Sequence, residues 1–254
     1  MFFTNLFESN LQIKNFAQKI IYYNQTESTT NDLWELYNEN QNNQLFIITD
    51  NQTNGKGRYD KTWKSQPSKS ITCSFILQNI FKNEFSNLYS ILIPIAIIKG
   101  IKKFLFIDAK IKWPNDIIYN NKKIGGILIE SKMNNKNSVF NIGIGLNVNE
   151  NQEDFSKELQ NIAISLKMIV GYSIQREPLL AEILNELNKL IINLDNERLI
   201  DLWMKNCDHI NKTVQFNKND EKISGTFKGI NNTGQALIEI HNQIIHYNQP
   251  ITII

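Results

Sequence analysis

Lys112-Trp113-Pro114-Asn115-Asp116 and, shortly after it, Lys122-Lys123-Ile124-Gly125-Gly126-Ile127-Leu128-Ile129-Glu130 are the stretch that decides the fold. The Pro-Asn pair predicts a turn, and Asn120-Asn121 predicts a second one, so short β-prone runs follow one another as antiparallel ribbons. Two successive glycines at the start of an apolar strand give up side-chain packing. That loss is expected where a ligand or another backbone lies against the strand.

Hydrophobic periodicity on both sides of this stretch predicts an α+β fold. Strands are expected at 19–23, 45–49, 71–77 and 139–148. Helices are expected at 32–40, after a loop and helix start at 27–32, and at 88–104, 163–170, 178–194 and 196–207. From Lys212 onward, short strands alternate with turns at 219–220, 231–234, 241–243 and 249–250, a pattern typical of a small all-β barrel. We therefore expect two packed domains, 1–208 and 209–254.

Composition excludes several classes of protein. The 27 Lys and Arg nearly balance the 25 Asp and Glu, giving a net charge of +2, so we expect no nucleic acid as a partner. The longest apolar run, 89–98, contains Pro94 and is too short to cross a membrane, and the N-terminus lacks the pattern of a secretion signal. Two distant cysteines suit a reducing compartment, so we expect a cytoplasmic protein.

All three histidines lie at or after residue 209. The rest of the chain therefore lacks imidazole, which argues against a Ser-His-Asp or Cys-His hydrolase and against a histidine-rich catalytic metal site.

The segment from Gln52 to Trp63 combines two glycines with Lys56, Arg58 and Lys61. Glycines let backbone N–H groups approach an anion, and the cations would neutralise phosphate charge while Trp63 covers a base or shields the ligand from water. The spacing is not that of a P-loop, and a basic loop of this kind is a plain exposed loop about as often as it binds phosphate.

Lys123 stands at the edge of the glycine pair. A cation there would bind both a substrate carboxylate and the attacked α-phosphate. Asp116 would orient that lysine, position an incoming amine, or help to hold a phosphate-bound magnesium ion. Equally, an isolated lysine is ordinarily solvated, and Trp-Pro-Asn-Asp alone could be a mere turn.

The run from Asn141 to Val148 alternates apolar residues with Asn and Gly. One face packs on the core, and the other, with Gly143 and Gly145, would form a shallow floor for a flat heterocycle. The third glycine of a dinucleotide-binding motif is absent, which argues against that kind of site. The alternative without a functional role is a strand with bulges.

In their order and spacing these motifs, together with Glu27-Ser28-Thr29-Thr30-Asn31, resemble the signature of biotin–protein ligases. The resemblance covers nearly the whole chain, and the segment Ser224–Ile230 is similar to the SH3-like barrel of that family. It implies a mixed sheet with flanking helices, related to class II aminoacyl-tRNA synthetases, plus a small C-terminal SH3-like β-barrel.

The resemblance also implies the chemistry. Biotin and ATP would react to biotinyl-5'-AMP with Mg²⁺ as the ion, and the biotinyl group would pass to a lysine of a biotin carboxyl carrier protein, by default that of acetyl-CoA carboxylase. A homodimer through an exposed sheet edge is plausible only by analogy. No metal ligands are identified.

Site residues carried over from the family fall into three groups, and some belong to more than one. The catalytic residues would be Lys123, Arg58 and Asp116. The biotin-binding residues would be Thr29, Thr30, Gln52, Gly55, Lys56, Arg58, Lys123 and Gly126. The ATP-binding residues would be Arg58, Lys61, Trp63, Lys112, Asn115, Asp116, Lys123 and Asn147.

The basic loop departs from the usual family pattern. Lys56 and Lys61 replace arginines, which loses their bidentate fork, and Asp60 replaces a glycine, which brings negative charge near the phosphates. We hypothesise faster leakage of the adenylate. Only about two dozen residues precede the Ser28-Thr29 motif, too few for a helix-turn-helix domain, so we expect no operator binding.

Two alternatives remain open. A lipoate–protein ligase shares the architecture, and a nonenzymatic carrier-binding or nucleic-acid module is more distant. The polar set Thr29, Thr30 and Gln52 favours biotin because buried polar groups matched to a ureido ring reject analogues lacking it. The biotin–protein ligase interpretation requires Arg58, Lys123 and the floor at Gly143 and Gly145 to converge on a single cavity that can hold biotinyl-AMP.

Overall fold

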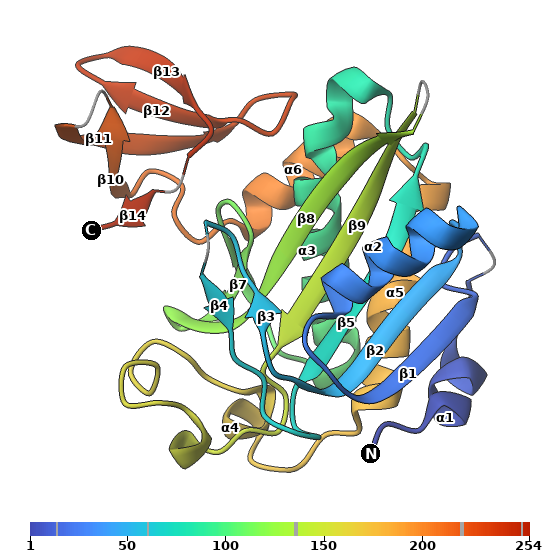
Figure 1. Cartoon of the computed structure of the whole chain (residues 1–254). Helices are drawn as coiled ribbons and strands as arrows, with labels where there is room; N and C mark the ends of the chain where they lie inside the picture. Colours follow the sequence, from blue (N-terminus) through green and yellow to red (C-terminus); the bar gives the residue numbers. More distant parts are fainter. Residues whose placement is uncertain (14, 60, 135–136, 219–220, 250) are drawn as a thin grey trace.

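The structure is a computed structural model that describes residues 1–13, 15–59, 61–134, 137–218, 221–249 and 251–254. Over these residues, seven strands form the main sheet in the order β1-β2-β5-β9-β8-β7-β6 (Figure 1). The strands are β1 Lys19–Thr26, β2 Leu45–Gln52, β5 Ile71–Gln78, β6 Lys110–Lys112, β7 Asp116–Tyr119, β8 Lys122–Asn134 and β9 Asn137–Leu146. Only the β1–β2 pair is parallel, so the sheet is mixed.

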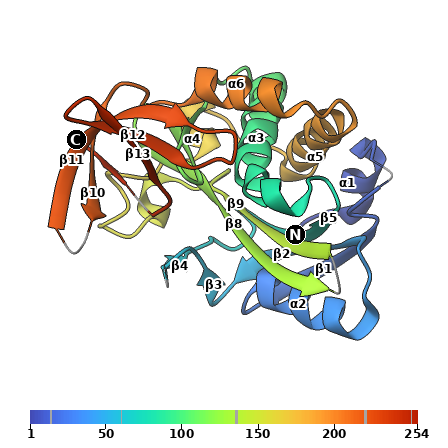
Figure 2. The same ribbon diagram turned by 90° about the horizontal axis from the view of Figure 1, so that it is seen from above.

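Helices cover both faces of this sheet, as the view from above shows (Figure 2). On one face lie α3 Tyr89–Leu105, α5 Arg176–Ile192 and α6 Asn196–Asn206, and on the other lies α2 Thr29–Asn40. The short α1 Thr4–Asn10 packs on α5. Gly100 allows α3 and α5 to pack closely, since a Cβ there would stand 2.6 Å from Cγ1 of Ile183.

Strand β5 shows how the alternating pattern builds both layers. Cys73 and Phe75 belong to the core beneath α3, whereas Ile76 belongs to the smaller core beneath α2. Thr72 and Ser74 share the face of Ile76 because successive side chains of a strand point to opposite sides. Burial raises the pKa of the Cys73 thiol, so this cysteine is a structural apolar group.

The C-terminal residues form a separate antiparallel sheet. Over the residues described there, its five strands follow the order β13-β12-β11-β10-β14. They are β10 Thr213–Lys218, β11 Glu221–Ile230, β12 Ala236–Ile240, β13 Gln243–Tyr247 and β14 Thr252–Ile253. Phe227 of β11 packs against Trp113, Trp203 and the ring of His209, so an aromatic cluster joins the two units.

These observations confirm the predicted α+β class, with a mixed sheet, flanking helices and a C-terminal β unit. The prediction that a helix begins at Ala163 was wrong, because α4 spans Leu166–Val170. Ala163 instead forms a β-bridge with Lys123, and the Ser165 hydroxyl caps the helix by accepting a hydrogen bond from Met168 N. Helix α1 was not predicted. Among the described residues, no helix has the length and apolar character needed to span a membrane.

Candidate active site

A cavity of about 520 Å³ opens on the α2 face of the main sheet. Two cross-strand rows of paired residues run along its floor. The first row is Ser74–Gly143–Leu128, and the second is Thr72–Gly145–Gly126–Asp116. Residues paired across neighbouring strands point to the same face, so the glycines of each row leave a flat surface between polar groups.

Each glycine of the motifs has its own structural reason. A Cβ at Gly145 would stand 2.4 Å from Cε2 of Trp63, because the indole lies directly on that backbone. A Cβ at Gly143 would stand 3.2 Å from Oγ1 of Thr30. Gly125 faces the opposite side of the sheet, where a Cβ would strike Leu146, whereas Gly126 faces the cavity beside Lys123. Gly125 is therefore needed for packing in the core, and Gly126 for the surface of the cavity.

One end of the cavity is buried and polar. The N–H and the hydroxyl of Thr29 donate to Oε1 of Gln52 at 2.8 and 3.1 Å. The hydroxyls of Thr29 and Ser74 are 2.8 Å apart, and the Asn141 amide donates to the carbonyl of Thr30 at 2.9 Å. All five residues are buried, and Thr29, Thr30 and Gln52 line the cavity while Ser74 and Asn141 support them from behind. This end therefore presents hydrogen-bonding groups that water reaches poorly.

Two residues of this polar end were missed as site residues. Ser74 lies on β5 with its hydroxyl bonded to Thr29, and the alternation of β5 could have signalled it. Ser28 precedes α2, is 1% exposed, and its hydroxyl has no hydrogen-bond partner among the described residues. Its place in the quoted Glu-Ser-Thr-Thr-Asn motif was the available signal.

The other end of the floor carries charge. Nζ of Lys123 lies 2.6 Å from Oδ1 of Asp116, and both side chains are partly exposed. Arg58 donates through Nη1 to Oδ1 of Asn115 at 3.3 Å. Asn115 is itself held by β8, because its amide donates to the carbonyl of Ile127 at 2.6 Å. Arg58, Lys123 and the glycine floor therefore line one cavity.

The basic loop folds as a small hairpin over the cavity. Its strands are β3 Gly55–Lys56 and β4 Thr62–Trp63, and Gly57 N donates to the carbonyl of Lys61 at 2.6 Å. The guanidinium of Arg58 lies 5.0 Å from the ring centre of Tyr59, a residue that the sequence did not single out. Asp60 lies outside the described residues, so its predicted effect on adenylate retention stays a prediction.

Gly55 is the one predicted site residue that the described cavity lining does not include. A Cβ there would meet Nε2 of Gln52 at 2.3 Å and the carbonyl of Trp63 at 2.4 Å. Its small size therefore lets the hairpin approach Gln52. The structure brings all the other predicted site residues around the cavity: Thr29, Thr30, Gln52, Lys56, Arg58, Lys61, Trp63, Lys112, Asn115, Asp116, Lys123, Gly126 and Asn147. Their individual roles remain predictions.

The wall near Asn147 is largely apolar, and its members were not predicted. They are Phe155, Leu159, Ile162 and Ala163, joined from the C-terminal sheet by Ile251 and Thr252. The Asn147 amide donates at 3.4 Å to the carbonyls of Lys123 and Ile164, which ties this wall to the end of the cavity that carries Lys123.

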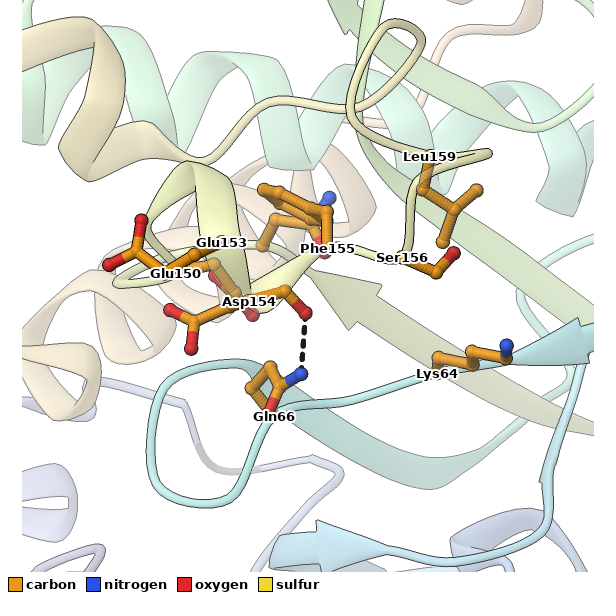
Figure 3. Close-up of a pocket in the computed structure, with 9 residues that line it drawn as sticks. Lys64, Gln66, Glu150, Glu153, Asp154, Phe155, Ser156 and Leu159 are labelled. Carbon is orange, nitrogen blue, oxygen red and sulfur yellow. Dashed lines mark hydrogen bonds between the residues drawn. The ribbon is translucent and has the colours of Figure 1, made fainter.

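A second pocket of about 280 Å³ adjoins this wall (Figure 3). It shares Lys64, Asn147, Phe155 and Leu159 with the larger cavity. Figure 3 shows the hydrogen bond of 2.6 Å from the Gln66 amide to the carbonyl of Asp154, which closes one side of the pocket. Burial raises the pKa of the nearby Glu150 carboxyl. The segment after the basic loop is thus fastened to the segment after Asn147.

Comparisons with known proteins agree with this geometry. Residues 22–149 match the model of the biotin/lipoate A/B protein ligase family, and residues 209–249 match the biotin protein ligase C-terminal domain. The bifunctional ligase/repressor BirA of Bacillus subtilis is 36% identical over 176 residues, which are 68% of this chain and 54% of that protein. The human biotin–protein ligase is 28% identical over 152 residues, which are 56% of this chain and 21% of that protein.

Solved structures share the fold. The biotin protein ligase from Aquifex aeolicus in complex with biotin and ATP has a TM-score of 0.78 at 23% identity, covering 93% of this chain and 98% of that one. The Leishmania major enzyme with biotinyl-5-AMP has a TM-score of 0.64 at 21% identity, covering 93% and 98%. The chain spans about half the length of the Bacillus relative that it matches. On these matches, the chain belongs to the biotin/lipoate A/B protein ligase family.

Proposed function

We propose that this chain is an ATP-dependent biotin–protein ligase. It forms biotinyl-5'-AMP from biotin and ATP and transfers the biotinyl group to a lysine of a biotin carboxyl carrier protein. One observation carries the proposal: a single cavity joins a buried polar end at Thr29 and Gln52 to a charged end at Lys123 and Asp116 across a glycine floor. The human relative named as a biotin–protein ligase and the Aquifex aeolicus structure of a biotin protein ligase with biotin and ATP support it.

The two ends fit the two ends of biotin. The ureido ring offers N–H donors and a carbonyl acceptor, which match the hydroxyl and amide groups of Thr29, Thr30, Ser74 and Gln52. The valeryl chain would run over Gly143, beside the indole of Trp63, which lies on Gly145 and would shield the chain from water. The carboxylate would then reach the ammonium of Lys123.

The first step is the attack of a biotin carboxylate oxygen on the α-phosphorus of ATP. The new P–O bond forms as the bond to the β-phosphate oxygen breaks, and pyrophosphate leaves. Both reactants are anions, so their approach needs cations. Lys56, Arg58, Lys61, Lys112 and Lys123 line the cavity and would lower this repulsion.

Magnesium is expected to bind together with ATP, and the side chains that line the cavity supply only part of its coordination. Among the described residues, no group of His, Cys, Asp or Glu side chains could hold a metal ion by itself, and Asp116 is the only carboxylate in the cavity lining. The ion would therefore enter bound to the ATP phosphates and neutralise part of their charge, with Asp116 as its protein ligand.

In the second step, the amine of the carrier lysine attacks the acyl carbon of biotinyl-AMP. The C–N bond forms, the bond to the AMP oxygen breaks, and the amine loses a proton. Asp116 lies where it could position that amine, since its carboxylate borders the floor beside Gly126. The hairpin with Trp63 must keep water out, because hydrolysis of the adenylate competes with transfer.

Several further assignments belong to the proposal. The carrier of acetyl-CoA carboxylase is the default partner, a homodimer through an exposed sheet edge is a possible assembly, and the domains divide between residues 208 and 209. Strand β1 is an edge strand of the described sheet.

Pyrophosphate exchange tests the function. The purified chain with ATP and biotin should exchange labelled pyrophosphate into ATP, and lipoate should support little exchange. A biotin carboxyl carrier domain should then become biotinylated. Exchange with lipoate instead of biotin would identify a lipoate ligase, and exchange with neither would favour a nonenzymatic carrier-binding module.

A further inference from the structure

Thr72 lines the cavity with a buried hydroxyl that makes no hydrogen bond to the described residues. The residue is 4% exposed and lines the cavity. Its Oγ1 has no hydrogen-bond partner among the described residues. Ser74, two residues along the same strand face, differs because its hydroxyl contacts both Thr29 and Thr30. On this face of β5, Thr72 is therefore the polar residue whose hydroxyl the described residues leave unsatisfied.

An unsatisfied buried hydroxyl costs stability, and valine would fill the same space without that cost. Position 72 lies near the start of β5, a strand that is buried on both faces, where β-branched apolar residues are favoured. A hydroxyl at this position makes physical sense if a ligand supplies its partner.

The register of the sheet places Thr72 relative to the two ends of the cavity. It pairs with Gly145, which pairs with Gly126, which pairs with Asp116. Asp116 is thus three strands away, roughly 14 Å at the usual strand spacing, whereas Ser74 is roughly 7 Å along the same strand. Nζ of Lys123 lies beside Gly126, two strands and roughly 10 Å from Thr72, so Thr72 lies nearer to Ser74 and the polar end of the cavity.

A second donor marks the same region. Nε1 of Trp63 is buried without a hydrogen-bond partner in the described part of the chain, and its ring lies on Gly145, the cross-strand neighbour of Thr72. An indole N–H can only donate, and a hydroxyl can donate as well as accept. Two buried donor groups near Gly145 thus have no partner among the described residues, and a ligand that brings an acceptor there would satisfy them.

Biotin has three kinds of acceptor. The ureido carbonyl is matched by the Thr29, Ser74 and Gln52 set, and the carboxylate by Lys123 and Arg58. The third is the thioether sulfur, which stands at the opposite side of the fused rings from the ureido carbonyl and is a weak acceptor. We infer that the Thr72 hydroxyl donates a hydrogen bond to the biotin sulfur and so contributes to specificity for the sulfur-containing ring. This inference rests on the proposed function.

Titration calorimetry with biotin and its sulfur-free analogue desthiobiotin tests the inference on three proteins: wild type, Thr72→Val and Thr72→Ser. Removing one hydrogen bond should weaken biotin binding by about threefold to tenfold in Thr72→Val, while desthiobiotin binding stays the same. Thr72→Ser keeps the hydroxyl and should retain the wild-type preference. Ligand-free Thr72→Val should melt no lower than wild type.

Equal losses for both ligands, or no loss for biotin, would overturn the role of Thr72 while leaving the proposed function intact. A wild-type protein that binds neither ligand would overturn the proposed function itself, and the inference with it. If Thr72→Val does not fold, Thr72→Ala, which also lacks the hydroxyl, should show the same selective loss, and an unselective loss there would count against the inference.

Discussion

The indole of Trp63 rests on the backbone of Gly145, so closely that a Cβ at position 145 would stand 2.4 Å from Cε2 and 2.7 Å from Cζ2 of the ring. Trp63 comes from the basic hairpin and Gly145 from the central strand β9. The contact therefore sets how deeply the hairpin sits over the floor of the cavity.

Gly145→Ala should displace Trp63 and weaken biotin binding. Overpacking of a tight contact costs about 1–3 kcal/mol, which corresponds to roughly 5-fold to 150-fold in affinity if the hairpin must shift. Gly126→Ala is the comparison, because its Cβ would meet only the flexible end of Lys123 at 3.2 Å, and its effect should be smaller. Calorimetric titration with biotin measures both, and an equal effect of the two variants would contradict the role given to the Trp63 contact.

Lys123→Ala should reduce biotin-dependent pyrophosphate exchange by at least about a hundredfold, the usual loss when a group that stabilises transition-state charge is removed. Far-ultraviolet circular dichroism should remain unchanged because the side chain is partly exposed. Lys122→Ala changes the neighbouring lysine, which the described cavity lining does not include, and should keep most of the activity. Exchange by Lys123→Ala within tenfold of wild type would remove the proposed role of Lys123.

Asp50→Asn should lower the free energy of unfolding by about 3–5 kcal/mol, because it leaves the buried guanidinium of Arg176 without its carboxylate. Asp50 is 3% exposed and Arg176 6%, and Nη2 lies 2.8 Å from Oδ1. The exposed pair of Asp108 with Lys102 offers a control, since Asp108→Asn should cost less than about 1 kcal/mol. Urea denaturation at pH 7 measures both changes in the free energy of unfolding. Similar changes for the two variants would argue against a large contribution of the buried Asp50–Arg176 pair.

The difference in the free energy of unfolding between wild type and Asp50→Asn should depend on pH. Burial alone would raise the pKa of its carboxyl, but hydrogen bonds from Arg176 and Tyr22 hold that pKa below the ordinary value. A lowered folded pKa means that the contribution is complete above about pH 4 and disappears as the pH falls through the folded pKa. Denaturation of wild type and Asp50→Asn from pH 7 to pH 3 should show the two converging only at the acid end.

His209 should make the fold sensitive to a different pH range. Burial lowers the pKa of its imidazole to about 4, whereas an unfolded chain has an ordinary value of about 6.5. Between these values the unfolded state takes up a proton that the folded state refuses, so stability falls as the pH drops. The folding equilibrium constant should change by at most about tenfold per pH unit. His209→Gln should flatten this slope, and His246→Gln at an exposed position should not.

Asp60→Gly tests the prediction made from the loop sequence. If the aspartate repels the phosphates, the glycine variant should release less biotinyl-AMP, which nonspecific biotinylation of a bystander protein would reveal. Equal labelling by wild type and variant would count against the prediction.

The sequence alone determined the order and type of most elements and the motifs that meet in the cavity. Alternation in 71–77 and the apolar face of 178–194 are local patterns, and local patterns specify strands and helices directly. Gly-Gly and Gly-Ile-Gly likewise indicated a surface that something must approach. These features need no knowledge of partners elsewhere in the chain.

Only the tertiary structure decided which residues face one another. The cross-strand row from Thr72 to Asp116 depends on the register of four strands, and Ile251 and Thr252 reach the cavity from a separate sheet. The tertiary structure also showed that the two adjacent glycines face opposite sides of the sheet: Gly125 packs on Leu146, and Gly126 borders Lys123. Register and docking are fixed by contacts between distant segments, so no window of sequence contains the information that places the Thr72 hydroxyl inside the cavity.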